Sequence, residues 1–185
     1  MSETVDSLSA ILESHAPWVA LTGAGISSAS GIPTYRDHTG TWLGSQPIQH
    51  DEFISEPVQR QRYWSRSALG WPRVGAAQPN ASHAALVKLE QAGLMTGVIT
   101  QNVDRLHQRA GSRRVIDLHG RLDQVKCLDC GHITTREAIQ NWIEAHNALP
   151  NTSALKLRPD GDADLPGHYV SDFRIPQCQQ CGGVV

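Results

Sequence analysis

One stretch near the N-terminus constrains the fold of this chain more than any other. An apolar run over residues 18–22 passes directly into a loop of small residues that contains Gly23 and Gly25 and extends to Gly31. Bare glycine backbone lets the phosphates of a ligand approach closely, and the N–H groups of a helix that starts there face an anion. The stretch therefore favours a strand that ends in a nucleotide-binding loop. A plain glycine-rich turn stays open as the alternative, because Ser28 stands where the dinucleotide fingerprint G-x-G-x-x-G places its third glycine.

Apolar periodicity places the regular elements along the chain. It predicts helices over residues 5–15, 59–69, 81–92, 105–110 and 135–148. It predicts strands over residues 18–22, 94–100 and 114–118. We expect the second helix to end at Gly70-Trp71-Pro72. Strands that alternate with helices predict a parallel sheet with right-handed crossovers. The fold class is therefore α/β, with residues 1–121 forming the first part of a Rossmann-like nucleotide-binding domain whose parallel sheet is incomplete.

Polar or glycine-rich segments follow all three predicted strands. They are residues 23–31, residues 101–104, and His119 with Gly120. Because the ligands of such sheets bind beyond the carboxyl ends of the strands, we expect these segments to converge on one site. His119 is the candidate general base, since histidine is the usual base near neutral pH.

Three other polar residues have both a functional and a structural interpretation. Asn102 and Asp104 could orient a substrate hydroxyl or a water molecule, or they could only cap the helix that follows. Arg36 could pair with a phosphate, or it could be a solvated surface residue. The sequence leaves these alternatives open.

The four cysteines form two Cys-x-x-Cys pairs, and they are the strongest metal signal in the sequence. The pairs are Cys127 with Cys130 and Cys178 with Cys181. Each pair can place two thiolates on one turn, and two such turns complete a closed tetrahedral site of the kind that holds a structural zinc ion. Redox-active dithiols are the alternative. We therefore predict that residues 122–185 form a small inserted zinc-binding module.

Charge and hydropathy argue against several classes of partner. The chain has 185 residues, a formal net charge of −2 and no stripe of basic residues, so nucleic acid is not expected as a partner. Its apolar runs are far shorter than the roughly 18 residues of a membrane span, so no membrane association is expected. The first six residues carry two acids and no basic residue, unlike a secretory signal or a transit peptide. These features predict a cytoplasmic protein.

Four motifs follow one another across about residues 18–183. They are Gly23-Ala24-Gly25-Ile26-Ser27 with Ser30-Gly31-Ile32-Pro33-x-Tyr35-Arg36, then Thr100-Gln101-Asn102-Val103-Asp104-x-Leu106-His107, then Leu118-His119-Gly120, and the two cysteine pairs. In this order the chain resembles the sirtuins (the Sir2 family), which are NAD-dependent protein lysine deacylases. Further segments resemble class II, the branch of the fourth mammalian sirtuin and bacterial relatives, namely Tyr35, Arg62-Tyr63-Trp64-Ser65-Arg66, Gly70-Trp71-Pro72 and Asp160-Gly161-Asp162.

The resemblance implies NAD as a co-substrate, one structural zinc ion held by the four cysteines, and acyl-lysine proteins as substrates. It also implies the residues that would contact NAD, which are Gly23, Ala24, Gly25, Ile26, Ser27, Ile32, Pro33, Tyr35, Arg36, Gln101, Asn102, Val103 and Asp104. His119 would deprotonate a ribose hydroxyl. The products would be nicotinamide and O-acyl-ADP-ribose.

Tyr63 and Arg66 are spaced so that they lie on one face of a helix. In sirtuins that remove acidic acyl groups, such a pair binds the distal carboxylate, and an arginine fork suits that contact. The resemblance thus implies a preference for dicarboxylic or longer acyl chains over acetyl. A solvated helix face is the alternative interpretation.

The sequence ends soon after the last cysteine pair, where a sirtuin core continues. We therefore expect it to correspond to roughly the N-terminal two-thirds of a sirtuin and to show little deacylase activity by itself. Protein mono-ADP-ribosylation is one alternative function. A catalytically inactive fragment that binds zinc and NAD is the other.

Overall fold

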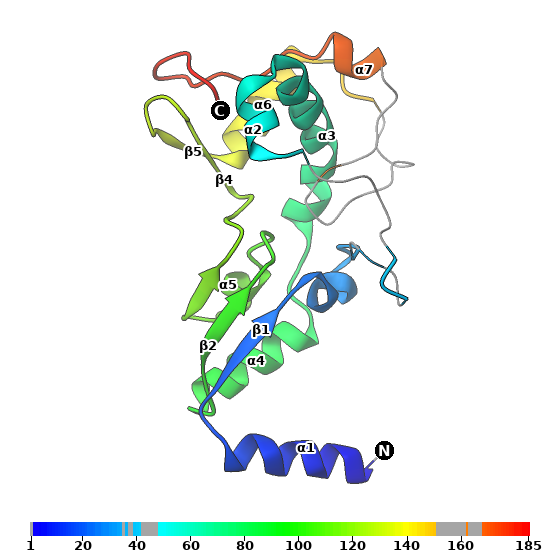
Figure 1. Cartoon of the computed structure of the whole chain (residues 1–185), viewed down its shortest axis with the longest axis vertical. Coiled ribbons are helices and arrows are strands. Elements are labelled where there is room, and N and C mark those ends of the chain that lie inside the picture. The colour runs from blue at the N-terminus through cyan, green and yellow to red at the C-terminus, as the bar shows by residue number, and fades with distance from the viewer. Residues whose placement is uncertain (1, 35, 37–38, 42–47, 151–161, 163–167) are drawn as a thin grey trace. The chain divides into compact units, whose positions relative to one another are not determined.

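The structure is a computed structural model, and it describes residues 2–34, 36, 39–41, 48–150, 162 and 168–185 (Figure 1). Its contacts divide the chain into two units. The first, called the sheet unit here, comprises Met1–Gly31 and Ala77–Arg121. The second, called the cysteine unit, comprises Ile32–Ala76 and Leu122–Val185.

The sheet unit is built on three parallel strands, as the sequence predicts. Its elements in chain order are α1 (Ser2–Ser14), β1 (Trp18–Thr22), the 3-10 helix η1 (Ala24–Ser30), α4 (Ala81–Gln91), β2 (Met95–Thr100), α5 (Leu106–Ala110) and β3 (Val115–Asp117). The strand order is β1-β2-β3, with Leu21, Ile99 and Ile116 side by side in register. The carboxyl ends of all three strands therefore meet at one edge of the sheet.

One face of this sheet is apolar and exposed. Val19 and Leu21 on β1 are 56% and 68% exposed, and Ile116 and Leu118 on and after β3 are 59% and 51% exposed. Parallel sheets are usually covered on both faces, so these side chains lie on a surface that such a fold normally buries.

Local sequence signals explain the ends of α4 and the shape of η1. The side-chain oxygen of Asn80 accepts a hydrogen bond from the Ser82 N–H at 2.9 Å and caps the start of α4. Gly93, just beyond the end of α4, has a φ of 73°, which glycine adopts at little cost. The glycine loop forms a 3-10 helix that ends at Gly31, also in the left-handed region.

The cysteine unit packs helices and a hairpin around one hydrophobic core. Its elements are α2 (His50–Ser55), α3 (Pro57–Ala76), β4 (Gln124–Lys126), β5 (Ile133–Thr135), α6 (Arg136–His146) and α7 (His168–Ser171). Trp64 and Ala68 of α3 pack with Ile139 and Ile143 of α6 and with Phe173. The antiparallel hairpin of β4 and β5 was not predicted from the sequence.

The expected break at Gly70-Trp71-Pro72 is wrong, because α3 continues through Pro72 to Ala76. A proline inside a helix removes one backbone hydrogen bond and crowds the preceding turn. Burial on both sides of the proline, at Leu69 and Val74, opposes this cost. Tertiary packing here outweighs a local signal.

The same packing accounts for the way contacts group the chain. The domains predicted over residues 1–121 and 122–185 stay a prediction. One join between the units falls after residue 121, where the sequence analysis placed a boundary. Residues 32–76, however, group with residues 122–185 and not with the expected nucleotide-binding domain. The physical reason is that α3 supplies Trp64 and Ala68 to the core that also contains Cys127 and Cys178.

Within the described residues, no helix is both long enough and apolar enough to span a membrane.

Candidate functional site

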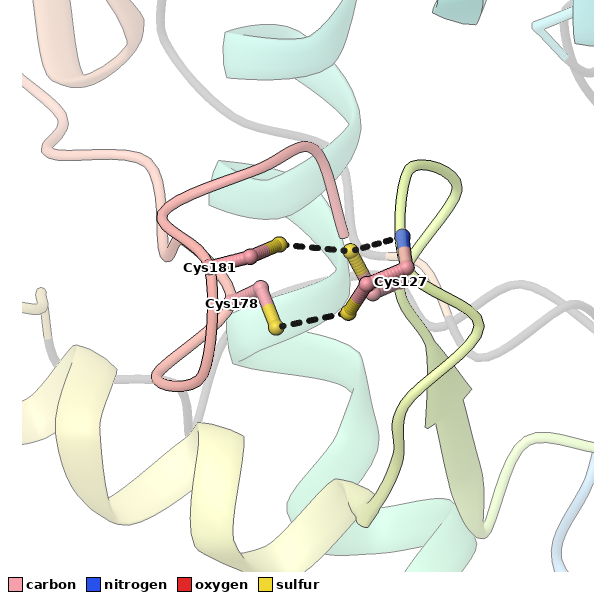
Figure 2. Close-up of side chains that lie close together, drawn as sticks. Cys127, Cys178 and Cys181 are labelled. Atoms are coloured by element: carbon pink, nitrogen blue, oxygen red, sulfur yellow. Dashed lines mark hydrogen bonds between the residues drawn. The ribbon is translucent and has the colours of Figure 1, made fainter.

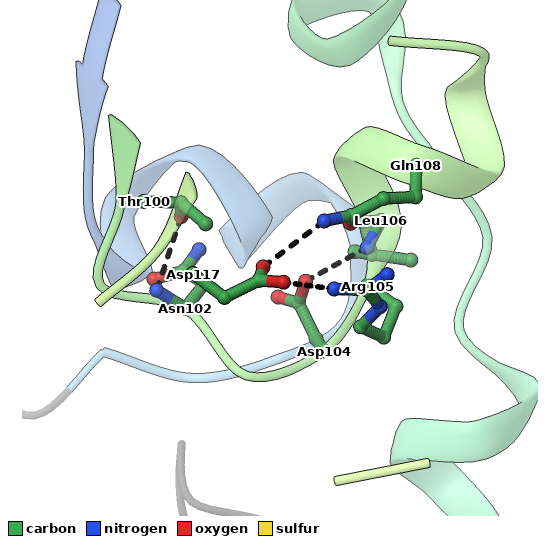
Figure 3. Close-up of polar contacts among 7 residues, drawn as sticks. All are labelled: Thr100, Asn102, Asp104, Arg105, Leu106, Gln108 and Asp117. Atoms are coloured by element: carbon green, nitrogen blue, oxygen red, sulfur yellow. Dashed lines mark hydrogen bonds and ion pairs between the residues drawn. The ribbon is translucent and has the colours of Figure 1, made fainter. Parts of the chain in front are cut away.

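The three segments that follow the strands do converge at the carboxyl edge of the sheet. The side-chain amide of Asn102 donates to the Gly23 carbonyl at 3.1 Å and to Ser27 Oγ at 3.0 Å. The Asn102 N–H in turn donates to Thr100 Oγ1 at 3.0 Å, a contact drawn in Figure 3. Asn102 therefore ties the exit of β2 to the glycine loop, and its side chain does not cap α5.

Asp104 caps the helix that follows it, one of the two interpretations that the sequence left open, and its other oxygen contacts the glycine loop. Its Oδ1 accepts from the Leu106 N–H at 2.9 Å, which caps α5 (Figure 3). Its Oδ2 accepts from Ser27 Oγ at 2.6 Å, a charge-assisted hydrogen bond between two buried groups. One buried carboxylate thus fixes both the helix start and the glycine loop.

The glycine loop leaves open space on its outer side. A Cβ built on Gly25 would meet no atom within 4 Å, and one on Gly23 would only contact the Gln101 side chain at 3.9 Å. The loop is also held from α4, because the Asn80 amide donates to the Ile26 carbonyl at 2.8 Å and to Ser30 Oγ at 2.9 Å. A rigid loop that presents bare backbone to open space suits a diphosphate.

His119 is exposed at the same edge, and its tautomer follows from one contact. Its Nδ1 lies 3.1 Å from the Gln101 carbonyl oxygen. A carbonyl only accepts, so Nδ1 carries the proton when the ring is neutral. Nε2 is then left with its lone pair, which is the form that a general base requires.

Two buried histidines form part of the same polar cluster. His83 and His107 are 0% and 1% exposed, and their ring centroids are 4.9 Å apart. His83 Nδ1 accepts from the Asn80 N–H at 3.3 Å, and His107 Nε2 lies 2.9 Å from Thr22 Oγ1. Burial lowers the pKa of both rings, the nearby His83 lowers that of His107 further, and the Asp104 carboxylate opposes these shifts. Both rings are therefore neutral at pH 7.

The cofactor-loop residues of the sequence analysis fall in the cysteine unit. Ile32 is 3% exposed, Pro33 is half-buried and Arg36 is exposed, with Arg36 Nη1 donating to the Gly40 carbonyl at 2.9 Å. Tyr35 lies outside the described residues. By contrast, Ala24, Ile26 and Val103 lie in the sheet unit, within or beside the segments described above.

Tyr63 and Arg66 occupy one side of α3 in surroundings that the sequence did not indicate. The Tyr63 ring contacts the Phe53 and Trp64 rings edge-on, at centroid distances of 5.1 and 5.4 Å. Arg66 is 5% exposed, and its Nε lies 3.4 Å from Asp162 Oδ2. The described residues thus already place one carboxylate, that of Asp162, beside this guanidinium.

The four cysteines are brought together as the sequence predicts (Figure 2). All four Sγ atoms lie within 4.8 Å of one another. Cys127 Sγ is 3.6 Å from Cys181 Sγ, and Cys130 Sγ is 3.7 Å from Cys178 Sγ. A tetrahedron of thiolates about 2.3 Å from zinc has edges of about 3.8 Å, whereas a disulfide is about 2.05 Å long. The donor set therefore fits a closed, structural zinc site and not a pair of disulfides.

The environment of Cys127 supports the thiolate form that zinc requires. A hydrogen bond from the Cys130 backbone N–H to the Cys127 sulfur lowers the pKa of the Cys127 thiol to about 7, although burial opposes the shift. Such turns of backbone N–H groups around sulfur are typical of cysteine knuckles that bind metal.

Sequence reasoning missed three contributors to the site in the sheet unit. Asn80 caps α4, but its contacts with η1 were not predicted. His107 was noted only as part of a motif, and its contact with Thr22 has no local signal. Arg105 adopts a left-handed backbone and is ion-paired with Asp117, and no local sequence signal indicates either feature.

Comparison with known proteins identifies the family. A model of the Sir2 family matches residues 23–185. The chain belongs to the Sir2 family. Among curated relatives, it is 47% identical to NAD-dependent protein deacetylase 3 of Pseudomonas syringae pv. tomato over 184 residues, covering 98% of this chain and 66% of the relative. It is 51% identical to the NAD-dependent protein deacetylase of Xanthomonas axonopodis pv. citri, covering 94% of this chain and 59% of the relative.

Solved Sir2 structures share the fold. A Sir2 protein bound to acetylated peptide superposes with a TM-score of 0.66 at 33% identity, covering 100% of this chain and 60% of the other. A Sir2 protein bound to a propionylated peptide gives a TM-score of 0.65 at 33% identity with the same coverage. The Sir2 family member described here thus spans 59% to 66% of the length of the curated relatives named above.

Proposed function

We propose that this chain carries the NAD-binding loop and the general base of an NAD-dependent protein lysine deacylase. The observation that carries the proposal is the placement of His119. Its Nδ1–H is held by the Gln101 carbonyl, and its basic Nε2 is exposed at the strand ends where the glycine loop, Asn102 and Asp104 meet. The names of the bacterial relatives and the peptide-bound Sir2 structures support the same assignment.

The residues of the sheet unit have distinct parts in this proposal. The backbone of Gly23, Ala24 and Gly25 would bind the diphosphate of NAD, and Ser27 and Asp104 would hold that loop in place. Asn102 would orient the loop toward the nicotinamide ribose. Bound NAD supplies the ADP-ribose that accepts the acyl group, with release of nicotinamide. His119 would take the proton of a ribose hydroxyl at Nε2.

The structural zinc ion would have no part in the chemistry. Four thiolates complete a tetrahedral coordination sphere, so no position would be left for a substrate. The thiolates would fix the β4–β5 hairpin to the segment that carries Cys178 and Cys181. The thiol cluster also supports a reducing compartment, and we propose the cytoplasm.

The test is product analysis with the full gene product and an acetyl-lysine peptide. We expect NAD-dependent formation of nicotinamide and O-acetyl-ADP-ribose in equal amounts. Replacing the base, His119→Asn, should reduce kcat by roughly 100-fold or more, whereas His15→Asn, at an exposed histidine of the same unit, should not change it. Label from NAD that ends up on protein would support mono-ADP-ribosylation instead. Zinc and NAD binding without turnover would support the inactive fragment.

We further propose that Tyr63 and Arg66 influence which acyl groups are accepted. An acidic acyl chain would compete with Asp162 for the Arg66 guanidinium. Asp162→Asn should then raise the turnover of glutaryl-lysine relative to acetyl-lysine peptides, and Arg66→Lys should lower it. An unchanged ratio of the two activities in both variants would contradict this part of the proposal.

A further inference from the structure

Arg105 stands at a position whose backbone does not favour arginine. It precedes α5 with a φ of 64° and a ψ of 15°, and it is the one non-glycine residue with a positive φ in the described part of the chain. Side chains with a Cβ are disfavoured in this left-handed region, whereas glycine adopts it freely. The Arg105 side chain makes no helix-cap hydrogen bond, since Asp104 caps α5. The reason for an arginine must therefore lie in what its guanidinium contacts.

The guanidinium is ion-paired with a carboxylate at the end of β3. Nη1 of Arg105 contacts Oδ2 of Asp117, and Gln108 Nε2 donates to Oδ1 of the same carboxylate at 3.0 Å (Figure 3). The side chains of Arg105 and Asp117 are 17% and 21% exposed, so the pair is largely shielded from water. With both oxygens engaged, the Asp117 carboxylate cannot turn without breaking one of these contacts.

Asp117 begins a short segment that is fixed at each successive residue. The Leu118 N–H donates to the Thr100 carbonyl at 2.9 Å, and His119 Nδ1 contacts the Gln101 carbonyl. Asp117, Leu118 and His119 thus each contact the end of β2 or the loop and helix that follow β2. That loop also carries Asn102 and Asp104.

We infer that Arg105 is a positioning residue for His119. Its ion pair with Asp117 fixes the end of β3 to the loop after β2, and this holds the His119 ring where Nδ1 reaches the Gln101 carbonyl. The disfavoured left-handed backbone of Arg105 is the conformation in which its guanidinium reaches Asp117. For its effect on turnover the inference rests on the function proposed above, but its effect on the His119 tautomer does not.

The experiment separates positioning from stability, because Arg105→Gly should lower turnover far more than it lowers stability. Glycine relieves the backbone, which offsets the loss of the ion pair, so the thermal midpoint should stay level, while kcat should fall roughly 10- to 100-fold with the KM for NAD within about twofold. Arg105→Lys, which keeps the charge but not the fork, should recover part of kcat. Asp117→Asn should resemble Arg105→Gly, and the double variant should be no worse than either single one. Arg109→Gln, at an exposed arginine of α5, is the control and should match wild type.

A second measurement does not depend on activity. Side-chain NMR of the His119 ring nitrogens should show the Nδ1–H tautomer in wild type and a mixture of tautomers in Arg105→Gly. An unchanged tautomer and an unchanged kcat in Arg105→Gly would overturn the inference, as would a loss of kcat that merely follows a loss of folded protein. If wild type forms no acyl-ADP-ribose, the proposed function fails by itself, and the tautomer alone decides whether Arg105 positions His119.

Discussion

In the sheet unit several buried polar side chains gather at the carboxyl ends of the strands, whereas in the cysteine unit the buried Arg136 and Gln140 connect two helices of the hydrophobic core. Ser27, Asp104 and His107 are 0%, 9% and 1% exposed. Ser27 of the glycine loop donates to Asp104, and His107 contacts Thr22, which precedes that loop. Buried polar groups cost free energy unless they are paired, so a cluster of them at one edge is expected where a ligand is bound.

The polar core of the cysteine unit connects helices instead of lining a site. Arg136 is 3% exposed, with its guanidinium 5.3 Å from the Trp64 ring and 5.3 Å from the Trp71 ring. Its Nη1 donates to Gln140 at 2.9 Å and its Nη2 to the Ser67 carbonyl at 3.2 Å. Burial lowers the pKa of Arg136 to about 10, so it stays charged at pH 7. These contacts hold α3 against α6. Comparison of the two units shows that buried polar side chains can either line a candidate binding site or connect helices in a core.

Removing metal from the cysteine site should have the largest effect and should fall on one unit. A structural zinc ion can contribute on the order of 10 kcal/mol to folding, and two of its four ligands, Cys127 and Cys178, belong to the hydrophobic core of the cysteine unit. With chelator, or in Cys127→Ser, hydrogen exchange should accelerate in β4, β5 and α6 and stay slow in β2. His132→Ser, at an exposed residue beside the site, is the control. Equal acceleration in β2 would contradict the independence of the two units.

Replacing the buried cation of the scaffold should have the next largest effect. Arg136→Met removes the guanidinium donor from the Gln140 and Ser67 oxygens and the cation from beside two indole rings. We expect a loss of about 2 to 4 kcal/mol in the unfolding free energy of the cysteine unit. Urea denaturation followed by tryptophan fluorescence measures it. Arg174→Met, at an exposed site of the same unit, should change stability by less than about 0.5 kcal/mol. A similar loss in both variants would show that Arg136 has no special place in the core.

The sequence could predict the sheet and much of its site because their signals are local. The apolar run of β1, the Asn80 cap and Gly93 each specify a nearby backbone conformation, and the order of strands and helices then brings the strand ends together. The course of α3 through Pro72 could not be predicted in this way. It depends on Trp64 and Ala68 packing against α6, a contact between segments about 70 residues apart.

The left-handed backbone at Arg105 escaped prediction for a different reason. Arginine carries no local preference for that conformation, so only its distant partner Asp117 explains it. The pairing of Arg66 with Asp162 is a similar case, since spacing along a helix shows which residues share a face but not what covers that face. The motifs located the site, and the structure was needed to show what fixes it.

The smallest expected effect concerns the neutral histidines of the sheet unit. The pKa of His83 and that of His107 are lowered on folding from the ordinary value of 6.5. At a pH between the folded and the unfolded pKa values, the unfolded chain binds more protons than the folded chain. The folded state is therefore most stable above about pH 6.5, and it loses stability as the pH falls from there toward the lowered pKa values of the folded state. Hydrogen exchange of β2 amides should therefore show a decline of about 1 kcal/mol in the opening free energy between pH 7.5 and pH 5.5. The decline should flatten in His83→Phe, which cannot be protonated, and persist in His15→Phe. An opening free energy that does not change with pH would mean that the fold does not lower the pKa of these rings. The buried polar groups of the sheet unit would then tolerate a positive charge, as the core of the cysteine unit tolerates that of Arg136.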